Sequence, residues 1–259
     1  MNSNKIPRLS LVGGGPGDPK LITLKAVEVL EQADIVLFDA LVNNELLNYA
    51  PNAQKIFVGK RRGWSSYTQF EINRLIVKMA NKFGHVVRLK GGDPMIFGRA
   101  QEEIAYAENH GLVVDVVPGI SSYSGIAAYN QVPITSRGVS QGFWVLTATD
   151  ERGGLASDID IAAQSKSNII ILMGTRKLAG IVERFKKHQG LDYPIALIQN
   201  GTMPNEKVLV STLAQVEEDV AYAQISSPAV IIIGEAARHV KSAKIMAELG
   251  RLEVFQKIG

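Results

Sequence analysis

The sequence predicts an α/β protein made of two α/β domains with mainly parallel sheets and a cleft between them. Short apolar runs alternate with amphipathic segments along all 259 residues. The apolar runs are uninterrupted, which is typical of strands in a parallel sheet that helices cover on both faces. Apolar residues make up 46% of the chain and charged residues 20%, an ordinary composition for a globular core.

The first half of the chain begins its helices with recognisable caps. Thr23 precedes one amphipathic segment, and Thr68 with Glu71 forms a capping-box pattern before a second. The helices are expected over residues 24–33, 67–84 and 99–110, the last closed by Gly111. The strands are expected over residues 9–13, 34–39, 85–89 and 112–117.

The second half repeats this alternation. Its strands are expected over residues 142–149, 168–174, 194–201 and 228–234, with helices such as 176–189 between them. The segment "VVPGISS" is the best division, which gives domains 1–117 and 118–259. Ligands of α/β proteins bind at the carboxyl ends of strands, so the cleft between the domains is the expected site.

The composition excludes several kinds of site. There is no cysteine, and the four histidines show no i, i+4 pairing, so we predict no metal site. The net charge of +3 is too small to indicate nucleic acid. No apolar run is long enough to span a membrane and the start lacks a signal-peptide core, so the predicted location is the cytoplasm.

Glycine-rich loops follow several predicted strands. The first, "VGGGPGDP", is not a dinucleotide fingerprint, because Asp18 occupies the place of the third glycine. No G-K-[ST] follows, so it is not a P-loop either. On its own, each loop is equally consistent with a turn that needs glycine. The later loops are "KGGDP" (90–94), "PGISS" (118–122), "LMG" (172–174) and "QNGT" (199–202).

These loops together predict a cleft that holds a polar small molecule through backbone groups. The Asp93 carboxylate could bind hydroxyls or an amine, whereas Met173 taken alone is more typical of a core residue. Basic residues near the loops could receive carboxylates. They are Lys60, Arg61, Arg62, Arg88, Lys90, Arg99 and Arg137. No aromatic residues interleave them, which disfavours single-stranded nucleic acid.

A set of segments resembles the S-adenosylmethionine-dependent uroporphyrinogen-III C-methyltransferases of the tetrapyrrole methylase superfamily. The resemblance runs from about Leu9 to Glu235. It is carried by 12–42, "VGKRRG" (58–63), "QFEIN" (69–73), "VVRLKGGDPMIFGRAQEE" (86–103), "VVPGISS", "VPITSRG" (132–138), "LMG" and "NGT". It implies a class III methyltransferase-like fold, a homodimer, and S-adenosylmethionine bound in the interdomain cleft and released as S-adenosylhomocysteine.

The resemblance also implies a reaction and its residues. Uroporphyrinogen III would be methylated at C2 and C7 to precorrin-2, which feeds sirohaem, cobalamin or haem d1. Asp39 would be a proton acceptor and Lys60 a proton donor. Arg99, as a catalytic residue, and Glu102 would handle the substrate or remove a proton, and Arg137 would bind a substrate carboxylate. The cofactor contacts would be Pro16, Gly91, Gly92, Asp93, Ile96, Ser121, Ser122, Met173 and Gly201.

The chemistry refines one of these roles and leaves alternatives open. Arginine is a poor base at its usual pKa, so we expect Arg99, with Arg137, to bind the acetate and propionate groups of the substrate. One alternative is another methyltransferase of the superfamily, acting on a different precorrin or on RNA, although such members usually share the first loop and not the whole set. The other is a tetrapyrrole or nucleotide carrier without catalysis.

Three departures from the family pattern border the substrate side. Ser136 stands where the family has histidine in "PLTHR", and Ala100 with Gln101 replaces two glycines of "FGRGGEE". Ala148 and Thr149 lie where "VTGH" is usual.

Overall fold

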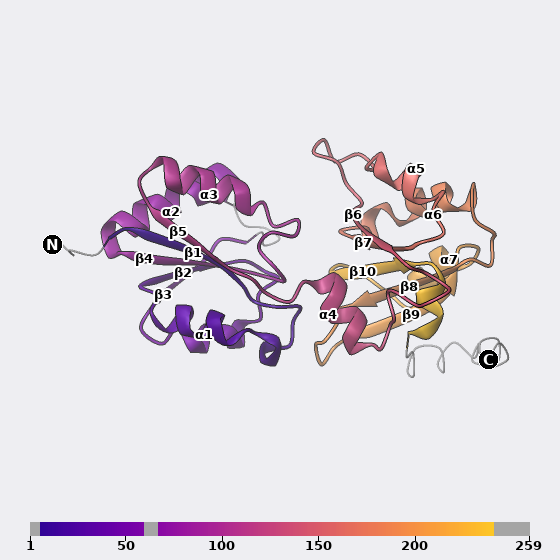
Figure 1. Ribbon diagram of the computed structural model, residues 1–259, viewed down its shortest axis with the longest axis horizontal. Coiled ribbons are helices and arrows are strands. Elements are labelled where there is room, and N and C mark those ends of the chain that lie inside the picture. The colour runs from indigo at the N-terminus through magenta and orange to yellow at the C-terminus, as the bar shows by residue number, and fades with distance from the viewer. Residues whose placement is uncertain (1–5, 60–66, 241–259) are drawn as a thin grey trace. The chain divides into compact units, whose positions relative to one another are not determined.

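The chain forms two compact units, which are described one at a time. The computed structural model describes residues 6–59 and 67–240. Unit 1 comprises Met1–Ser122 and unit 2 comprises Tyr123–Gly259 (Figure 1). The sequence places the division after Val117 instead. Both units are α/β, as the alternating pattern predicts.

The sheet of unit 1 is parallel throughout. Its order is β3-β2-β4-β1-β5, and every neighbouring pair runs in the same direction. The strands are β1 (Arg8–Gly13), β2 (Ile35–Phe38), β3 (Gln54–Phe57), β4 (His85–Lys90) and β5 (Val113–Val117). The sequence did not predict β3, whose four residues are exposed or half-buried and so lack an apolar run.

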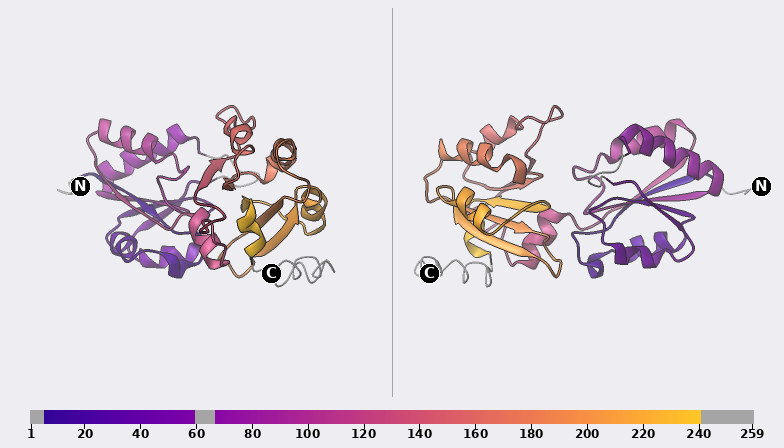
Figure 2. Two further views of the ribbon diagram at one scale, coloured as in Figure 1. Left: turned by 45° about the vertical axis from the view of Figure 1, so that its right-hand side comes forward. Right: turned by 180° about the vertical axis from the view of Figure 1, so that it is seen from behind.

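Helices cover both faces of this sheet. The helices α2 (Gln69–Phe83) and α3 (Ala100–Asn109) lie on one face, and α1 (Leu24–Glu31) lies on the other (Figures 1 and 2). The predicted caps are confirmed: the Thr23 hydroxyl accepts from the Ala26 amide at 3.1 Å, and Thr68 and Glu71 form the full capping box.

Successive side chains of β4 point to opposite faces of the sheet, and this determines which face its two basic residues occupy. Val87 and Leu89 pack in the apolar cluster that includes α1, and Val86 packs in the cluster that includes α2 and α3. Side chains two residues apart share a face of a strand. Arg88 and Lys90 therefore point, with Val86, toward the helices α2 and α3.

The sheet of unit 2 is mixed. Its order is β6-β7-β10-β8-β9, and only the β6–β7 pair is parallel. The strands are β6 (Phe143–Thr147), β7 (Asn168–Leu172), β8 (Pro194–Gln199), β9 (Lys207–Thr212) and β10 (Ala229–Ile233). The prediction of mainly parallel sheets is thus confirmed for unit 1 and wrong for this sheet. Apolar runs report burial on both faces, which antiparallel strands between two helical layers share.

Two apolar clusters sandwich this second sheet. One cluster joins the sheet to α5 (Asp158–Ala162), α6 (Leu178–Lys186) and α7 (Val216–Tyr222). The other joins it to α4 (Ser122–Tyr129) and the turn at Glu235–His239. Within residues 6–59 and 67–240, no helix has the length and apolar character needed to cross a membrane.

Candidate functional site

The loops that follow β1 and β4 are joined by backbone hydrogen bonds. The Gly92 amide donates to the Gly15 carbonyl at 2.7 Å, and the Gly15 amide donates back to Gly92 at 3.2 Å. The Gly14 amide also donates to the Lys90 carbonyl at 2.7 Å. Because β1 and β4 are neighbouring parallel strands, their carboxyl ends meet at one edge of the sheet.

The glycines of these loops are required by contact between backbones. A Cβ atom on Gly119 would lie 2.4 Å from the Gly92 carbonyl oxygen, and one on Gly13 would lie 2.5 Å from the Gly119 nitrogen. Gly92 has φ +69, a conformation that favours glycine. A Cβ atom on Gly91 would lie 2.8 Å from that of Leu41. The turn interpretation of these glycines therefore holds, whether or not a ligand also approaches them.

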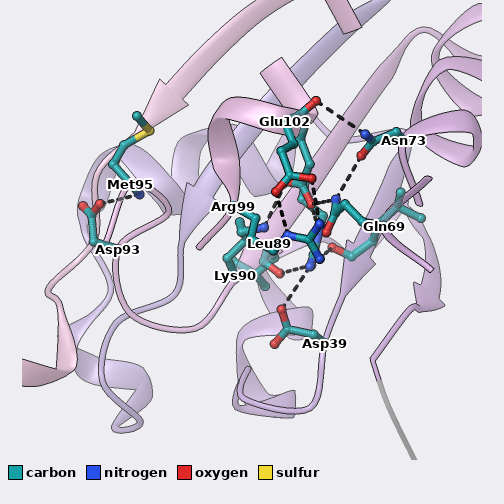
Figure 3. Close-up of polar contacts among 12 residues, drawn as sticks. Asp39, Gln69, Asn73, Leu89, Lys90, Asp93, Met95, Arg99 and Glu102 are labelled. Carbon is teal, nitrogen blue, oxygen red and sulfur yellow. Dashed lines mark hydrogen bonds and ion pairs between the residues drawn. The ribbon is translucent and has the colours of Figure 1, made fainter. Parts of the chain in front are cut away.

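Asp93 joins the β4 loop to the β5 loop. One carboxylate oxygen accepts from the Met95 amide at 2.8 Å, a contact drawn in Figure 3, and the other accepts from the Gly119 amide at 3.0 Å. Both oxygens are therefore engaged by the chain itself. If Asp93 also binds hydroxyls or an amine of a ligand, as the sequence predicts, its oxygens must accept those hydrogen bonds in addition to the two from the backbone. Pro16, Ser121 and Ser122 lie in or beside the same group of loops.

The loop after Asp93 is strained and exposed. Phe97 and Arg99 have φ of 51 and 55, in the left-handed region that is uncommon for residues other than glycine. Gly98 admits no side chain, because a Cβ atom would lie 2.2 Å from the Pro94 carbonyl oxygen. Ile96 is 38% exposed and Met95 53%. Backbone strain of this kind concentrates at ligand-binding segments.

Arg99 and Glu102 form a two-pronged ion pair at the start of α3. The guanidinium Nε and NH2 groups each donate to one Glu102 oxygen at 2.7 Å. This hydrogen bonding raises the pKa of Arg99 and lowers the pKa of Glu102. Both side chains are thus favoured in their charged forms.

A cluster of charged side chains is buried between β4 and α3. The Glu103 carboxylate accepts from Arg88 Nε at 3.3 Å and from Lys90 Nζ at 2.9 Å. Gln69 on α2 donates to the same carboxylate at 3.0 Å. Figure 3 shows how Gln69 and Asn73 close the cluster from the side of α2. Arg88 is 4% exposed, Lys90 5% and Glu103 1%, so these charges are withdrawn from water.

This burial corrects one expectation from the sequence. The sequence predicts that Arg88 and Lys90 can receive ligand carboxylates, but both side chains are buried and paired with Glu103 inside unit 1. Burial, and next the neighbouring Arg88 charge, lower the pKa of Lys90, while Glu103 opposes that effect. Sequence reasoning missed Glu103. Two basic residues on one face of a buried strand were the signal that a buried acid must lie opposite.

Asp39 lies at the exposed end of this cluster, just after β2. One carboxylate oxygen accepts from Arg88 NH2 at 3.1 Å (Figure 3). The other accepts from the Leu41 amide at 3.0 Å. Its side chain is 24% exposed. The predicted proton donor, Lys60, lies outside the described residues, as do Arg61 and Arg62.

The remaining predicted residues belong to unit 2. Met173 follows β7 with φ 56 and is 55% exposed, so it is not a core residue. Gly201 follows β8, and a Cβ atom there would lie 2.6 Å from Ile126. Arg137 is exposed in a turn. In the described part of the chain, no group of three or more acidic or histidine side chains could hold a metal ion.

Comparison with known proteins places these features in a family. The family of Tetrapyrrole (Corrin/Porphyrin) Methylases matches residues 8–217. The uroporphyrinogen-III C-methyltransferase of Methanocaldococcus jannaschii is 37% identical over 91% of this chain and 98% of its own length. The sirohaem synthase of Azotobacter vinelandii is 42% identical over 88% of this chain, which spans half the length of that relative.

A solved structure agrees with these relatives. The uroporphyrin-III C-methyltransferase of Thermus thermophilus, crystallised with S-adenosylhomocysteine, is 36% identical. It superimposes with a TM-score of 0.77 over 89% of this chain and 99% of its own.

Proposed function

Because the chain belongs to the tetrapyrrole methylase family, we propose that it transfers methyl groups from S-adenosylmethionine to uroporphyrinogen III. The observation that carries this proposal is the match to a uroporphyrinogen-III C-methyltransferase over nearly the whole of both chains. The related structure that holds S-adenosylhomocysteine supports the cofactor. The substrate is then a small tetrapyrrole that carries several carboxylates.

For this reaction the protein must mainly position the two reactants, because both are already reactive. The methyl group of a sulfonium is already electrophilic, and a pyrrole carbon is electron-rich, so alignment of the two supplies much of the rate. The sulfur–methyl bond breaks as the carbon–methyl bond forms, and the resulting cation then loses a proton. We propose that the Asp39 carboxylate accepts this proton and that Lys60 acts as a proton donor. Repetition at C2 and C7 gives precorrin-2.

The proposed cofactor contacts divide between direct and indirect roles. Ile96 and Met173 expose side chains that can contact a ligand. Gly91, Gly92 and Gly201 can offer a ligand only backbone groups, whereas Pro16, Ser121 and Ser122 can offer backbone groups and a side chain. Asp93 acts through the loops that it joins. A cofactor site in a cleft between the domains stays a prediction.

The substrate contacts follow from charge. Arg99 and Arg137 are exposed cations that suit acetate and propionate groups. Glu102 holds the Arg99 guanidinium in a fixed plane. We further propose a cytoplasmic homodimer that acts on a small molecule and requires neither nucleic acid nor a membrane.

The test is to incubate the protein with methyl-labelled S-adenosylmethionine and uroporphyrinogen III under reducing conditions. We expect two labelled methyl groups per tetrapyrrole, counted by mass spectrometry. Failure to label the tetrapyrrole while S-adenosylhomocysteine still binds in calorimetry would favour another precorrin or RNA as substrate. Loss of binding as well would favour a carrier without catalysis.

A further inference from the structure

The cluster formed by Arg88, Lys90 and Glu103 is costly to the fold. Each buried ion loses hydration worth several kcal/mol, and apolar side chains of similar volume are often at least as stabilising as a buried ion pair. Two cations and one carboxylate also leave one positive charge to be balanced. Stability alone therefore gives no reason for this cluster at the centre of unit 1.

The contacts of Arg88 show where that remaining charge is directed. Its Nε donates to Glu103 and its NH1 donates to the Leu89 carbonyl at 2.9 Å, so the plane of the guanidinium is fixed. Its NH2 is left to reach Asp39 at 3.1 Å. Side-chain exposure rises from 0% at Glu103 through 5% at Arg88 to 24% at Asp39. Asp39 is thus where the cluster meets solvent.

The rest of the cluster keeps Arg88 in this position. Lys90 and Gln69 occupy the other contacts of the Glu103 carboxylate, at 2.9 and 3.0 Å. Glu103 therefore cannot turn away without leaving buried donors unpaired, which costs about 1–3 kcal/mol for each group. Arginine keeps its proton at any ordinary pH, so the charge offered to Asp39 is permanent.

We propose that Arg88 is a positioning residue for methyl transfer: anchored by Glu103, it holds the Asp39 carboxylate in the orientation that receives the substrate proton. The proposal rests on the proposed function and on Asp39 as the proton acceptor. Each Asp39 oxygen already accepts one hydrogen bond, from Leu41 or from Arg88. A carboxylate oxygen has two lone pairs, so the contacts from the described part of the chain occupy one on each oxygen and leave the other able to take the proton.

The test is a double-mutant cycle between Arg88 and Asp39. Arg88→Lys keeps the charge but loses the planar fork that reaches Glu103 and Asp39 together. We expect it to lower kcat about 10-fold or more, with unchanged KM for S-adenosylmethionine and unchanged calorimetric affinity for S-adenosylhomocysteine. In an Asp39→Asn background, the same substitution should have no further effect on kcat.

Controls separate positioning from folding. Arg88→Gln leaves Lys90 and Glu103 as a balanced pair, and it replaces Arg88→Lys in the cycle if that variant does not fold. Arg8→Lys alters another arginine of unit 1, paired with Asp115 at the surface, and should leave kcat unchanged.

Two results would overturn the positioning role. One is an equal loss of kcat from the Arg88 change with and without Asp39. The other is a full kcat in Asp39→Asn. In both cases the wild-type protein still methylates uroporphyrinogen III. A wild-type protein that does not do so would instead defeat the proposed function.

Discussion

The two units bury different kinds of side chain. Among the described residues, every buried arginine, lysine and glutamate lies in unit 1, whereas unit 2 buries a single acid, Asp219, which accepts from the Ser211 hydroxyl at 2.6 Å. The units also differ in their strand-end turns. Unit 1 packs glycine backbone against glycine backbone where β1, β4 and β5 end, and places Phe97 and Arg99 in the left-handed region further along the β4 loop. Unit 2 places the residues directly after β7 and β8, Met173 and Asn200, in that region, followed by Thr202.

This difference helps to separate buried residues that stabilise the fold from buried residues that have another role. A sheet in unit 2 with nearly apolar faces shows that an α/β layer needs no buried ion cluster. The charges of unit 1 are thus better explained by the Asp39 carboxylate at their exposed end. Unit 2 also carries backbone strain, because residues other than glycine adopt the left-handed conformation directly after two of its strands.

The largest expected effect comes from removing the centre of the ion cluster. Glu103→Ala leaves Arg88 and Lys90 buried without their acid, so we expect unit 1 to lose about 3–5 kcal/mol of stability. Hydrogen exchange should show the loss in peptides from β1 and β4 and not in those from β7 and β8.

The neighbouring glutamate is the matched control for that change. Glu102 lies on the same helix, and its pair with Arg99 is half-exposed. Glu102→Ala should therefore change stability by less than about 1 kcal/mol. Equal losses from the two substitutions would mean that the buried pairs of Glu103 contribute no more to the stability of unit 1 than the exposed pair of Glu102 does.

The sequence could reveal most elements of both units, although not the strands β3 and β9, and it could not reveal the through-space pairings within the units. Period and capping predicted most helices and strands, because burial and caps are local properties. Strand direction in unit 2 was not accessible, since buried strands of either direction are apolar runs. The Arg88–Glu103 pair joins β4 to α3, and the link from Asp93 to Gly119 requires β1 to lie between β4 and β5.

The second-largest effect is expected from disturbing the close glycine contacts of unit 1. Gly119→Ala would force a Cβ atom to within 2.4 Å of the Gly92 carbonyl oxygen, and we expect a loss of about 2–3 kcal/mol. Gly142 in unit 2 has open space around its Cα, so Gly142→Ala should leave stability within about 0.5 kcal/mol. Urea denaturation of the two variants measures both. A tolerated Gly119→Ala would show that the loops can separate.

The smallest effect is expected at Met173, and it tests whether this strained residue of unit 2 contacts the cofactor. Met173 is exposed with φ 56, so Met173→Gly relieves a backbone cost of about 1–2 kcal/mol and adds a glycine entropy cost of about 0.5–1 kcal/mol. The net gain in stability should be about 0.5 kcal/mol. If Met173 contacts the cofactor, however, calorimetry should show affinity for S-adenosylhomocysteine falling about fivefold, because a thioether contact worth about 1 kcal/mol is lost.

Gln224 distinguishes strain from binding, because it is exposed with φ 52 and lies outside every proposed contact. Gln224→Gly should stabilise unit 2 by a similar amount and leave affinity for S-adenosylhomocysteine unchanged. A loss of affinity in both variants would assign the effect of Met173→Gly to backbone flexibility in unit 2. A loss in Met173→Gly alone would mean that unit 2 tolerates a strained strand end because its side chain meets the cofactor, as unit 1 tolerates buried charge because Arg88 meets Asp39.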